Sequence, residues 1–238
     1  MSISTQFIHT LNTFPGKHPE LRELTLAGMP RPPEIPRGTL RRYGSGSALF
    51  REGAASSEVF VLVSGIVKLV RHLPNGRARI VGLHGPGAVL GMLADRPGWP
   101  INPHSAMTLG PAEAECWSRR CLHRLRFERP ESYIELLERV HDQASQADLW
   151  ITEFSTGRIK SRVARLILFL ERIETGVGEG EVELLTCQEM GEILGITPES
   201  VSRVVASMKR EGLLETLTDG ASDRLRCDLA ALQRIAGD

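Results

Sequence analysis

The stretch "ITPESVSRVV", residues 196–205, places Glu199, Ser202 and Arg203 within about one turn of an expected helix. A carboxylate accepts hydrogen bonds, whereas a guanidinium donates them from a planar fork. In the major groove of DNA, a glutamate can accept from the amino group of cytosine, and an arginine can donate to O6 and N7 of guanine. The types and spacing of these residues therefore suit contacts with base edges.

Two helix starts and one helix end position these side chains. Thr186 with Glu189 three residues later forms a capping-box pattern, which predicts a first helix. Gly195 is a candidate for the left-handed residue that ends this helix. Thr197 then predicts the cap of a second helix with Pro198 at its first position, where a missing N–H does no harm.

Two short helices joined by about three residues are typical of a helix-turn-helix, although a helical hairpin without DNA has the same outline. Gly191 favours the motif, since a small residue lets the helices cross closely. The segment from residue 213 to 229 predicts two strands around Asp219-Gly220, which makes a winged variant. The residues predicted to bind DNA are Thr186, Gln188, Thr197, Glu199, Ser200, Ser202, Arg203 and Lys209.

The charge balance gives no general attraction to a polyanion. Lys and Arg number 29, as do Asp and Glu. From residue 158 onward we count 11 basic and 14 acidic residues, a net charge of −3. Phosphate contacts must therefore come from local clusters. These are Arg158, Lys160, Arg162 and Arg165 on one helix, and Arg203, Lys209, Arg210, Arg224 and Arg226 further on.

Short apolar stretches broken by glycines extend from about residue 39 to residue 117. Within them, turns are predicted at Ser64-Gly65, at Pro74-Asn75-Gly76 and at Gly85-Pro86-Gly87. Closely spaced strands with such turns favour an antiparallel sandwich or jelly roll. The fold class is therefore α+β, with a β-roll at the N-terminal side and helices after it.

Residues 131–155 contain neither Gly nor Pro, and their apolar or small residues alternate at spacings of four and three. This pattern predicts a long helix with an a/d stripe. The stripe either packs on the chain's own sheet or pairs with a second copy, and we favour pairing because two alanines allow close approach. The predicted dimer interface is Leu137, Val140, Ala144, Ala147, Ile151 and Phe154.

Gly157 interrupts the helical pattern, and a second amphipathic helix follows over residues 158–173. Its apolar face is predicted to contain Ile159, Val163, Leu166, Ile167 and Leu170. Residues 174–180 are expected to form a loop. The chain thus divides into a sensor roll at 1–130, a dimerisation helix at 131–156 and a DNA-binding domain at 157–238.

Several classes of protein are excluded by what the sequence lacks. Its longest apolar runs are about five residues, against the roughly 20 that a membrane helix needs. The first 20 residues show no secretory signal, and four cysteines in 238 residues indicate reduced thiols, so a cytoplasmic location is expected. Cys116 and Cys121 have no second pair nearby, so no metal site is expected. No catalytic constellation is recognised, and we do not expect an enzyme.

Over residues 30–235 the sequence resembles the superfamily of the cyclic-AMP receptor protein and the fumarate-nitrate reduction regulator. The most specific part is "TCQEMGEILGITPESVSRVVASMKREGLL". The resemblance implies a cyclic-nucleotide-binding-like roll, a dimerisation helix and a winged helix-turn-helix in a homodimer that contacts double-stranded DNA and RNA polymerase. Glu199, Ser202 and Arg203 match the E-x-x-S-R pattern of the anaerobic and nitrogen-oxide regulators, which implies a palindrome like TTGAT-N4-ATCAA.

The sensor departs from the family's cyclic-nucleotide pattern, in which a Gly-Glu pair meets the ribose and an Arg meets the phosphate. Gly91 is kept, but Met92 replaces the Glu and His104 replaces the Arg. Losing that Arg removes the main charge-assisted contact to phosphate, which argues against cyclic AMP. The stretch "MLADRPGWPINPH" either lines a pocket for an apolar or aromatic effector or is a plain loop. The candidate effector residues are Gly91, Met92, Trp99, His104 and Ser105.

Other sensor chemistries of the family were compared in the same way. An iron-sulfur sensor needs a cysteine cluster near the N-terminus, and the first cysteine here is Cys116. The haem ligands of the carbon-monoxide sensors correspond to Gly91 and Leu93, which cannot bind haem iron. Haem held by one of the seven histidines stays open, so the cofactor is undetermined. The sequence thus predicts a DNA-binding regulator with an effector other than cyclic AMP, and a haem or gas sensor as the alternative.

Overall fold

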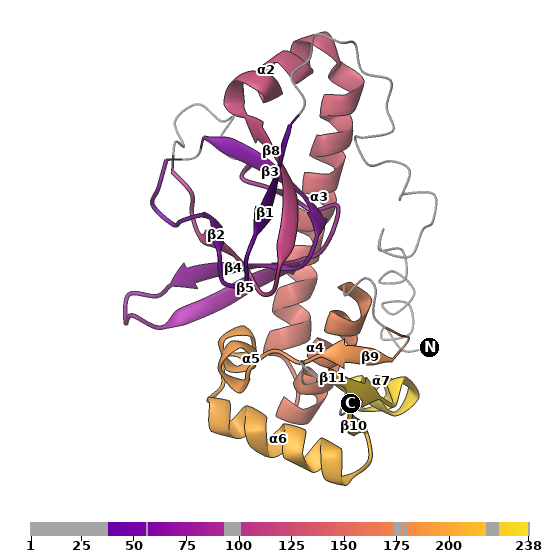
Figure 1. The fold of residues 1–238 in the computed structure, drawn as a ribbon. Helices are drawn as coiled ribbons and strands as arrows, with labels where there is room; N and C mark the ends of the chain where they lie inside the picture. Colours follow the sequence, from indigo (N-terminus) through magenta and orange to yellow (C-terminus); the bar gives the residue numbers. More distant parts are fainter. Residues whose placement is uncertain are drawn as a thin grey trace.

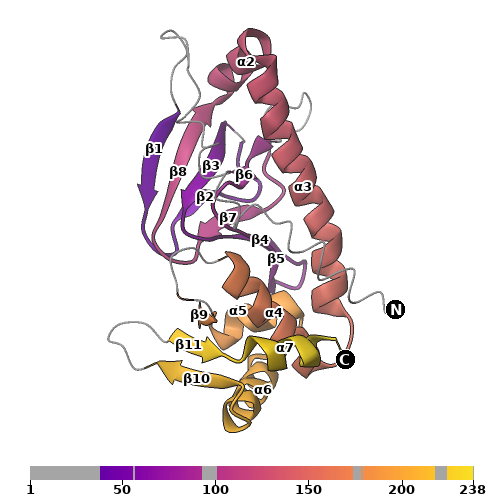
Figure 2. The same cartoon turned by 90° about the vertical axis from the view of Figure 1, so that its right-hand side faces the viewer.

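The structure is a computed structural model that describes residues 38–55, 57–92, 101–173, 178, 180–217 and 224–237. A β-roll lies beside a long helix, and a smaller helical unit with three short strands lies at one end of both (Figures 1 and 2). We call strands β1–β8 the roll, and α4–α7 with β9–β11 the winged unit. This arrangement confirms the predicted α+β class with a roll, a long helix and a winged helix-turn-helix.

The roll consists of two four-stranded antiparallel sheets. One has the order β1-β8-β3-β6 and the other the order β2-β7-β4-β5. Their strands are Thr39–Tyr43 (β1), Ala48–Phe50 (β2), Glu58–Ser64 (β3), Val67–His72 (β4), Ala78–His84 (β5), Val89–Leu90 (β6), Ser105–Thr108 (β7) and Ala112–Ser118 (β8). Four consecutive residues of β3, Val59–Leu62, are all buried, because this strand is covered on both faces.

The predicted turns lie where the strands of the roll reverse. Gly65, between β3 and β4, has φ of +82°. A Cβ at this position would also lie 2.5 Å from the carbonyl oxygen of Pro111. Only glycine combines this left-handed conformation with so close an approach, so the predicted turn at Ser64-Gly65 is confirmed.

Two helices follow the roll, and the sequence predicted only the second. Helix α2 (Arg119–Glu128) starts at Ser118, whose side chain accepts a hydrogen bond from the N–H of Cys121. Helix α3 (Pro130–Ser155) begins with a proline at its first turn and extends for 26 residues, about 39 Å at 1.5 Å per residue. It lies along the whole height of the roll (Figure 2), so one straight element joins the two ends of the molecule.

The winged unit begins after Gly157, whose φ of +86° turns the chain from α3 into α4 (Ile159–Ile173). It continues through β9 (Glu181–Glu183), α5 (Cys187–Leu194), α6 (Pro198–Arg210), β10 (Leu214–Leu217), β11 (Arg224–Cys227) and α7 (Leu229–Ala236). The three strands form an antiparallel sheet of order β10-β11-β9. The predicted two-stranded wing is thus β10 and β11, and its predicted turn at Asp219-Gly220 lies outside the described residues.

One hydrophobic cluster joins the roll to the winged unit. It contains Val70, Ile80 and Leu83 from the roll together with buried residues of α4, α5 and α6. Among the apolar residues expected on one face of α4, Val163, Leu166, Ile167 and Leu170 are fully buried. Ile159, expected on the same face, is 38% exposed because it is the first residue of α4 and precedes the packed part of the helix.

Helix α7 and strand β9 were also missed from the sequence. Helix α7 has only eight residues and is fixed by packing on α4 and by the Asp228 cap, which accepts from the N–H of Ala231. Strand β9 has three residues and is stabilised by pairing with β11. Such short elements depend on tertiary contacts rather than on a local pattern. No helix in the described ranges is long and apolar enough to cross a membrane.

Candidate nucleic-acid interface and effector cavity

The helix pair α5–α6 has the local signals that the sequence predicted. Thr186 and Glu189 form the complete capping box at the start of α5. Gly195 ends α5 with φ of +67°, and the side chain of Thr197 accepts from the N–H of Ser200 at the start of α6. The two helices thus begin and end at the predicted residues.

Gly191 of α5 lies so close to the turn after this helix that there is no room for a larger residue. A Cβ there would lie 2.8 Å from the carbonyl oxygen of Ile196. Val201 and Met208 are fully buried and attach α6 to the winged unit. The polar residues of α6 therefore lie on a surface whose orientation is fixed by packing. Helix α6 lies at the lower edge of the molecule, at the end opposite α2 (Figure 1).

The structure brings most of the predicted DNA-facing residues to the exposed side of the helix pair. Exposed residues among them are Thr186, Gln188, Thr197, Glu199, Ser202, Arg203 and Lys209, and Ser200 is partly exposed. Arg203 donates to Ser200 Oγ at 3.3 Å, and Gln188 donates to Glu192 Oε1 at 2.9 Å. These exposed bonds can be exchanged for contacts to a ligand at little cost.

The charge of Glu199 is stabilised by its place in the first turn of α6. Its pKa lies below the ordinary value because the carboxylate accepts from its own backbone N–H and from Thr197, and because Arg203 is nearby. The positive end of the helix dipole favours an anion in the same place. Glu199 is therefore charged at neutral pH and can act only as an acceptor.

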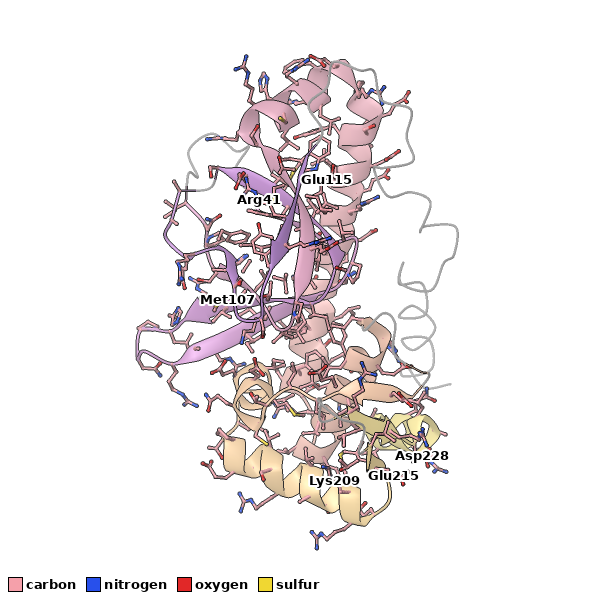
Figure 3. The ribbon with its side chains drawn as sticks, viewed as in Figure 1. Arg41, Met107, Glu115, Lys209, Glu215 and Asp228 are labelled. Atoms are coloured by element: carbon pink, nitrogen blue, oxygen red, sulfur yellow. The ribbon has the colours of Figure 1, made fainter. Side chains whose placement is uncertain are left out.

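Lys209 lies at the other end of α6, against the wing (Figure 3). Its Nζ donates to Thr216 Oγ1 on β10 at 3.1 Å. Arg224, on β11, is exposed, and Arg226 is paired with Glu181 at 3.3 Å. Lys209 is therefore exposed beside the wing and available to a phosphate, and Arg224 is exposed on the wing itself.

The structure corrects the prediction that the basic residues of α4 contact DNA phosphates. Arg162 donates to the carbonyl oxygens of Phe154 and Leu194, and Arg165 donates to those of Glu153, Thr156 and Ala236. Lys160 forms an ion pair of 2.6 Å with Glu211. These side chains hold α3, α5 and α7 together, so Arg162 and Arg165 are not available to phosphate.

The roll also touches the helix-turn-helix directly. Lys68 on β4 forms an ion pair of 2.7 Å with Glu189, and both side chains are less than one-fifth exposed. Burial opposes the charge of Glu189, but hydrogen bonds from Lys68 and Thr186 lower its pKa below the ordinary value. Arg79 on β5 donates to the carbonyl oxygen of Ile193 at 3.4 Å. The sensor side of the chain is thus bonded to the capped start and to the end of α5.

A cavity of about 830 Å³ lies between the roll, α3 and the winged unit. Its wall comes mainly from β5, β6 and residues 102–104 of the roll, from residues between 140 and 154 of α3, and from parts of α4 and α7. This volume falls in the range of about 300–1,000 Å³ that is usual for small-molecule sites.

Three of the five predicted effector residues line this cavity, namely Gly91, Met92 and His104. The prediction that Ser105 contacts the effector is corrected, because Ser105 is not among the described residues of the wall. It is 7% exposed, and its Oγ accepts from the N–H of Glu52. Trp99 lies outside the described residues. Within the described ranges, no three His, Cys, Asp or Glu side chains gather in a group that could hold a metal ion.

The predicted dimer face of α3 is partly exposed. Leu137 is 42% and Ile151 is 62% exposed. Ala144 and Ala147 are exposed as well, and Val140 is partly buried. Phe154 is a correction: it is 3% exposed and packs edge-on against Trp150 and Phe169. Its side chain therefore lies in the chain's own core and not on a surface that a partner could reach.

The comparisons with known proteins divide the chain in the same order. The family described as "Cyclic nucleotide-binding domain" matches residues 40–128, and the family described as "Crp-like helix-turn-helix domain" matches residues 161–235. The transcriptional activatory protein AadR of Rhodopseudomonas palustris is 30% identical over 185 residues, which are 75% of this chain and 74% of AadR. The chain belongs to the CRP/FNR superfamily of transcription regulators.

Other proteins are similar to this chain in sequence or in fold. The transcriptional activator protein FnrL of Cereibacter sphaeroides is 27% identical over 205 residues, 83% of this chain and 80% of FnrL. The structure of FixK2 from Bradyrhizobium japonicum has a TM-score of 0.70 at 20% identity and covers 83% of this chain and 96% of that one. As a CRP/FNR regulator the chain is a DNA-binding protein, and its relatives are not enzymes, as the sequence predicted.

Three features of this CRP/FNR regulator were not found from the sequence. They are the Lys68–Glu189 ion pair, the hydrogen bond between Gln143 and His84, and the position of Arg172 on the cavity wall. The partners in both bonds come from different elements, and the wall around Arg172 includes the roll, so no local spacing could reveal them.

Proposed function

We propose that this CRP/FNR regulator works as a homodimer whose two α6 helices read a palindrome resembling TTGAT-N4-ATCAA. The observation that supports it is the exposed set Glu199, Ser202 and Arg203 on a helix whose opposite side is buried through Val201 and Met208. The carboxylate is suited to a cytosine amino group and the guanidinium to guanine O6 and N7.

The second copy is proposed to pair along α3. Exposed apolar residues recur on it at Ile134, Leu137 and Ile151, with two exposed alanines between them. Pairing of two such helices would place the two α6 helices on successive major grooves, about 34–36 Å apart in proteins of this kind. The dimer acts in the cytoplasm and contacts RNA polymerase, and residues 1–130, 131–156 and 157–238 are its sensor, dimerisation and DNA-binding parts.

Binding-site selection with the purified full chain tests this proposal. Half-sites of the TTGAT type are expected, whereas TGTGA half-sites would contradict it. Arg203→Ala should lower affinity for the selected site about 10- to 100-fold, because a bidentate contact to guanine discriminates by about 1–3 kcal/mol. Glu199→Ala should relax base preference at a single position of each half-site.

The cavity is proposed to be the effector site, with an effector other than cyclic AMP. Met92 and His104 stand on its wall, in the places where the cyclic-nucleotide receptors of the superfamily carry a glutamate and an arginine. Burial lowers the pKa of His104, so its ring is neutral at physiological pH and offers no charge to a phosphate. A gel shift on the palindrome with and without cyclic AMP, haem and reductant tests this proposal. Cyclic AMP should have no effect.

A haem-dependent gas sensor is the second candidate. His84 and His104 both line the cavity and both have lowered pKa values, so their rings are neutral and can offer a nitrogen lone pair. A Soret band in the purified protein, lost in one of the single variants His84→Ala and His104→Ala, would favour this candidate.

A further inference from the structure

We infer that the cavity binds an elongated, largely apolar molecule with one acidic group, and that Arg172 receives the acid. This inference rests on the proposed function in which an effector occupies the cavity. It adds the chemical class of the effector and the side chain that receives its charge.

The length of the cavity wall is the first argument. Its wall combines Val89 and Leu90 of β6, Ala147 and Trp150 of α3, and Phe169 and Arg172 of α4. A ligand that fills this space must extend from the roll to the winged unit. It would therefore touch the sensor and the DNA-binding side of the chain at the same time.

The middle of the cavity is apolar and partly aromatic. Trp150, Phe154 and Phe169 form a cluster with ring centroids 4.7–5.8 Å apart, all in edge-to-face geometry. All three line the cavity. Such a wall stabilises hydrocarbon or aryl groups by burial of apolar surface and offers nothing to hydroxyl groups. The body of the ligand is therefore apolar.

The charges on the described wall do not balance. It contains two arginines, Arg165 and Arg172, and one acid, Glu153, so that one positive charge remains. Arg165 uses its guanidinium for Glu153, at 3.6 Å, and for backbone carbonyls. Arg172 has no hydrogen bond or ion pair with any described residue, and Glu153 and Glu171 act on it only through space.

A half-buried guanidinium with no partner among the described residues is unfavourable there, since a desolvated charge needs an opposite charge or acceptors. Burial lowers the pKa of Arg172, but an arginine stays charged in a protein. A carboxylate beside Arg172 would supply two acceptors in the geometry that a guanidinium prefers. The ligand is therefore a single acid and not a neutral or cationic molecule.

The polar groups around His84 give no second anion site. Gln143 on α3 accepts from the N–H of Val89 at 3.1 Å through Oε1, so its Nε2 donates to His84 Nδ1 at 3.1 Å. Burial and the nearby His104 lower the pKa of His84 to about 4, so this ring is neutral at pH 7. These groups are thus uncharged, and Arg165 is already paired, which leaves Arg172 as the group on the described wall that suits the acid.

Calorimetric titration of the full chain with three probes of equal length tests the inference: decanoate, decanol and decyltrimethylammonium. We expect decanoate to bind about ten- to a hundredfold more tightly than decanol, which is the range of a charge-assisted hydrogen bond. Decyltrimethylammonium should bind more weakly than either. Equal affinities for the acid and the alcohol, or tighter binding of the cation, would overturn the inference without the need for any variant.

Arg172→Gln should remove the preference for decanoate and leave decanol binding unchanged, while Arg172→Lys should keep part of it. Arg77→Gln, at an exposed arginine of the β4–β5 turn, is the matched control and should change neither. A preference that survives Arg172→Gln in a folded protein would contradict the assignment. The assignment would also be contradicted if cyclic AMP displaced decanoate and bound with the same affinity as decanoate. A haem that occupies the cavity would contradict it as well.

DNA binding is measured separately, by anisotropy of a labelled palindrome with and without decanoate. Loss of all specific DNA binding would contradict the proposed function while the decanoate preference still reports on the cavity. A decanoate preference that depends on Arg172 supports the inference whatever the DNA readout shows.

Discussion

The residues of α6 proposed to contact bases, Glu199, Ser202 and Arg203, lie within five consecutive positions, whereas the cavity takes its wall from residues between Phe50 and Gly237. In α6 the order of residues along one helix fixes which side chains face outward. In the cavity, neighbours belong to the roll, α3, α4 and α7, and their contact depends on how these elements pack. Changes at the two regions should therefore have different consequences.

The largest effect is expected from Phe154→Ala, which should lower the stability of the fold around the cavity and leave the DNA sequence preference of α6 unchanged. Phe154 is 3% exposed and packs on two aromatic rings, and loss of such a side chain costs about 3–5 kcal/mol of stability. The measurement is urea unfolding at fixed protein concentration. Phe127→Ala, at a residue that is 69% exposed, is the control and should change stability by less than about 0.5 kcal/mol. A change in the selected DNA sequence in Phe154→Ala would contradict the separation.

The pH dependence of stability should report on the cavity. The pKa of His84 is lowered to about 4 from 6.5, so the unfolded chain binds a proton before the folded chain does as the pH falls. This contribution to stability is complete above pH 6.5 and decreases down to about pH 4, by at most about 3.4 kcal/mol at about 1.36 kcal/mol per pKa unit. Unfolding curves across this window should lose that decrease in His84→Gln and keep it in His123→Gln. An unchanged slope in His84→Gln would mean that the cavity does not hold this ring neutral.

Lys68→Met tests the contact that links the two regions. The ion pair with Glu189 is mostly buried, and removal of one partner should lower stability by about 1.5–3 kcal/mol. Arg42→Met is the matched control, since its pair with Glu113 leaves the arginine side chain 84% exposed; there the effect should be below about 1 kcal/mol. A double-mutant cycle with Glu189→Gln isolates the pair from the capping box. Additive effects in that cycle would mean that the two side chains do not interact in solution.

The smallest effect is expected at Lys209. Lys209→Ala should weaken binding to all DNA sequences alike and reduce the slope of log affinity against log salt by about 0.9, the value for one phosphate contact. The slope is measured by titration of a specific and a random duplex at several salt concentrations. A change of base preference instead of a uniform loss would place Lys209 at a base edge.

The fold was predictable where one local pattern determines one element. The capping box at Thr186, the left-handed end at Gly195 and the Thr197-Pro198 start gave α5 and α6 from residue types alone. The a/d spacing gave α3 to within one residue at its start. Helix α7 and strand β9 were missed because eight and three residues have no stable structure without their partners.

The same limit explains the errors in the candidate site. Phe154 belongs to the a/d stripe of α3 by spacing, yet the bend at Gly157 brings Phe169 of α4 against it and buries it. Arg162 and Arg165 form a basic cluster by composition, but the packing of α4 directs them to backbone carbonyls. In both cases a residue's role changed because a second element covered it.

The sequence by itself determined the helix-turn-helix, the identity of the residues exposed on α6 and the loss of the usual phosphate partner at His104, because each depends on residues close together in the chain. Only the tertiary structure decided that Lys68 holds Glu189, that His84 is kept neutral beside Gln143, and that Arg172 lies on the cavity wall with no partner among the described residues. Those properties arise from burial and from charges brought together across the fold, and neither is encoded at a fixed spacing in the chain.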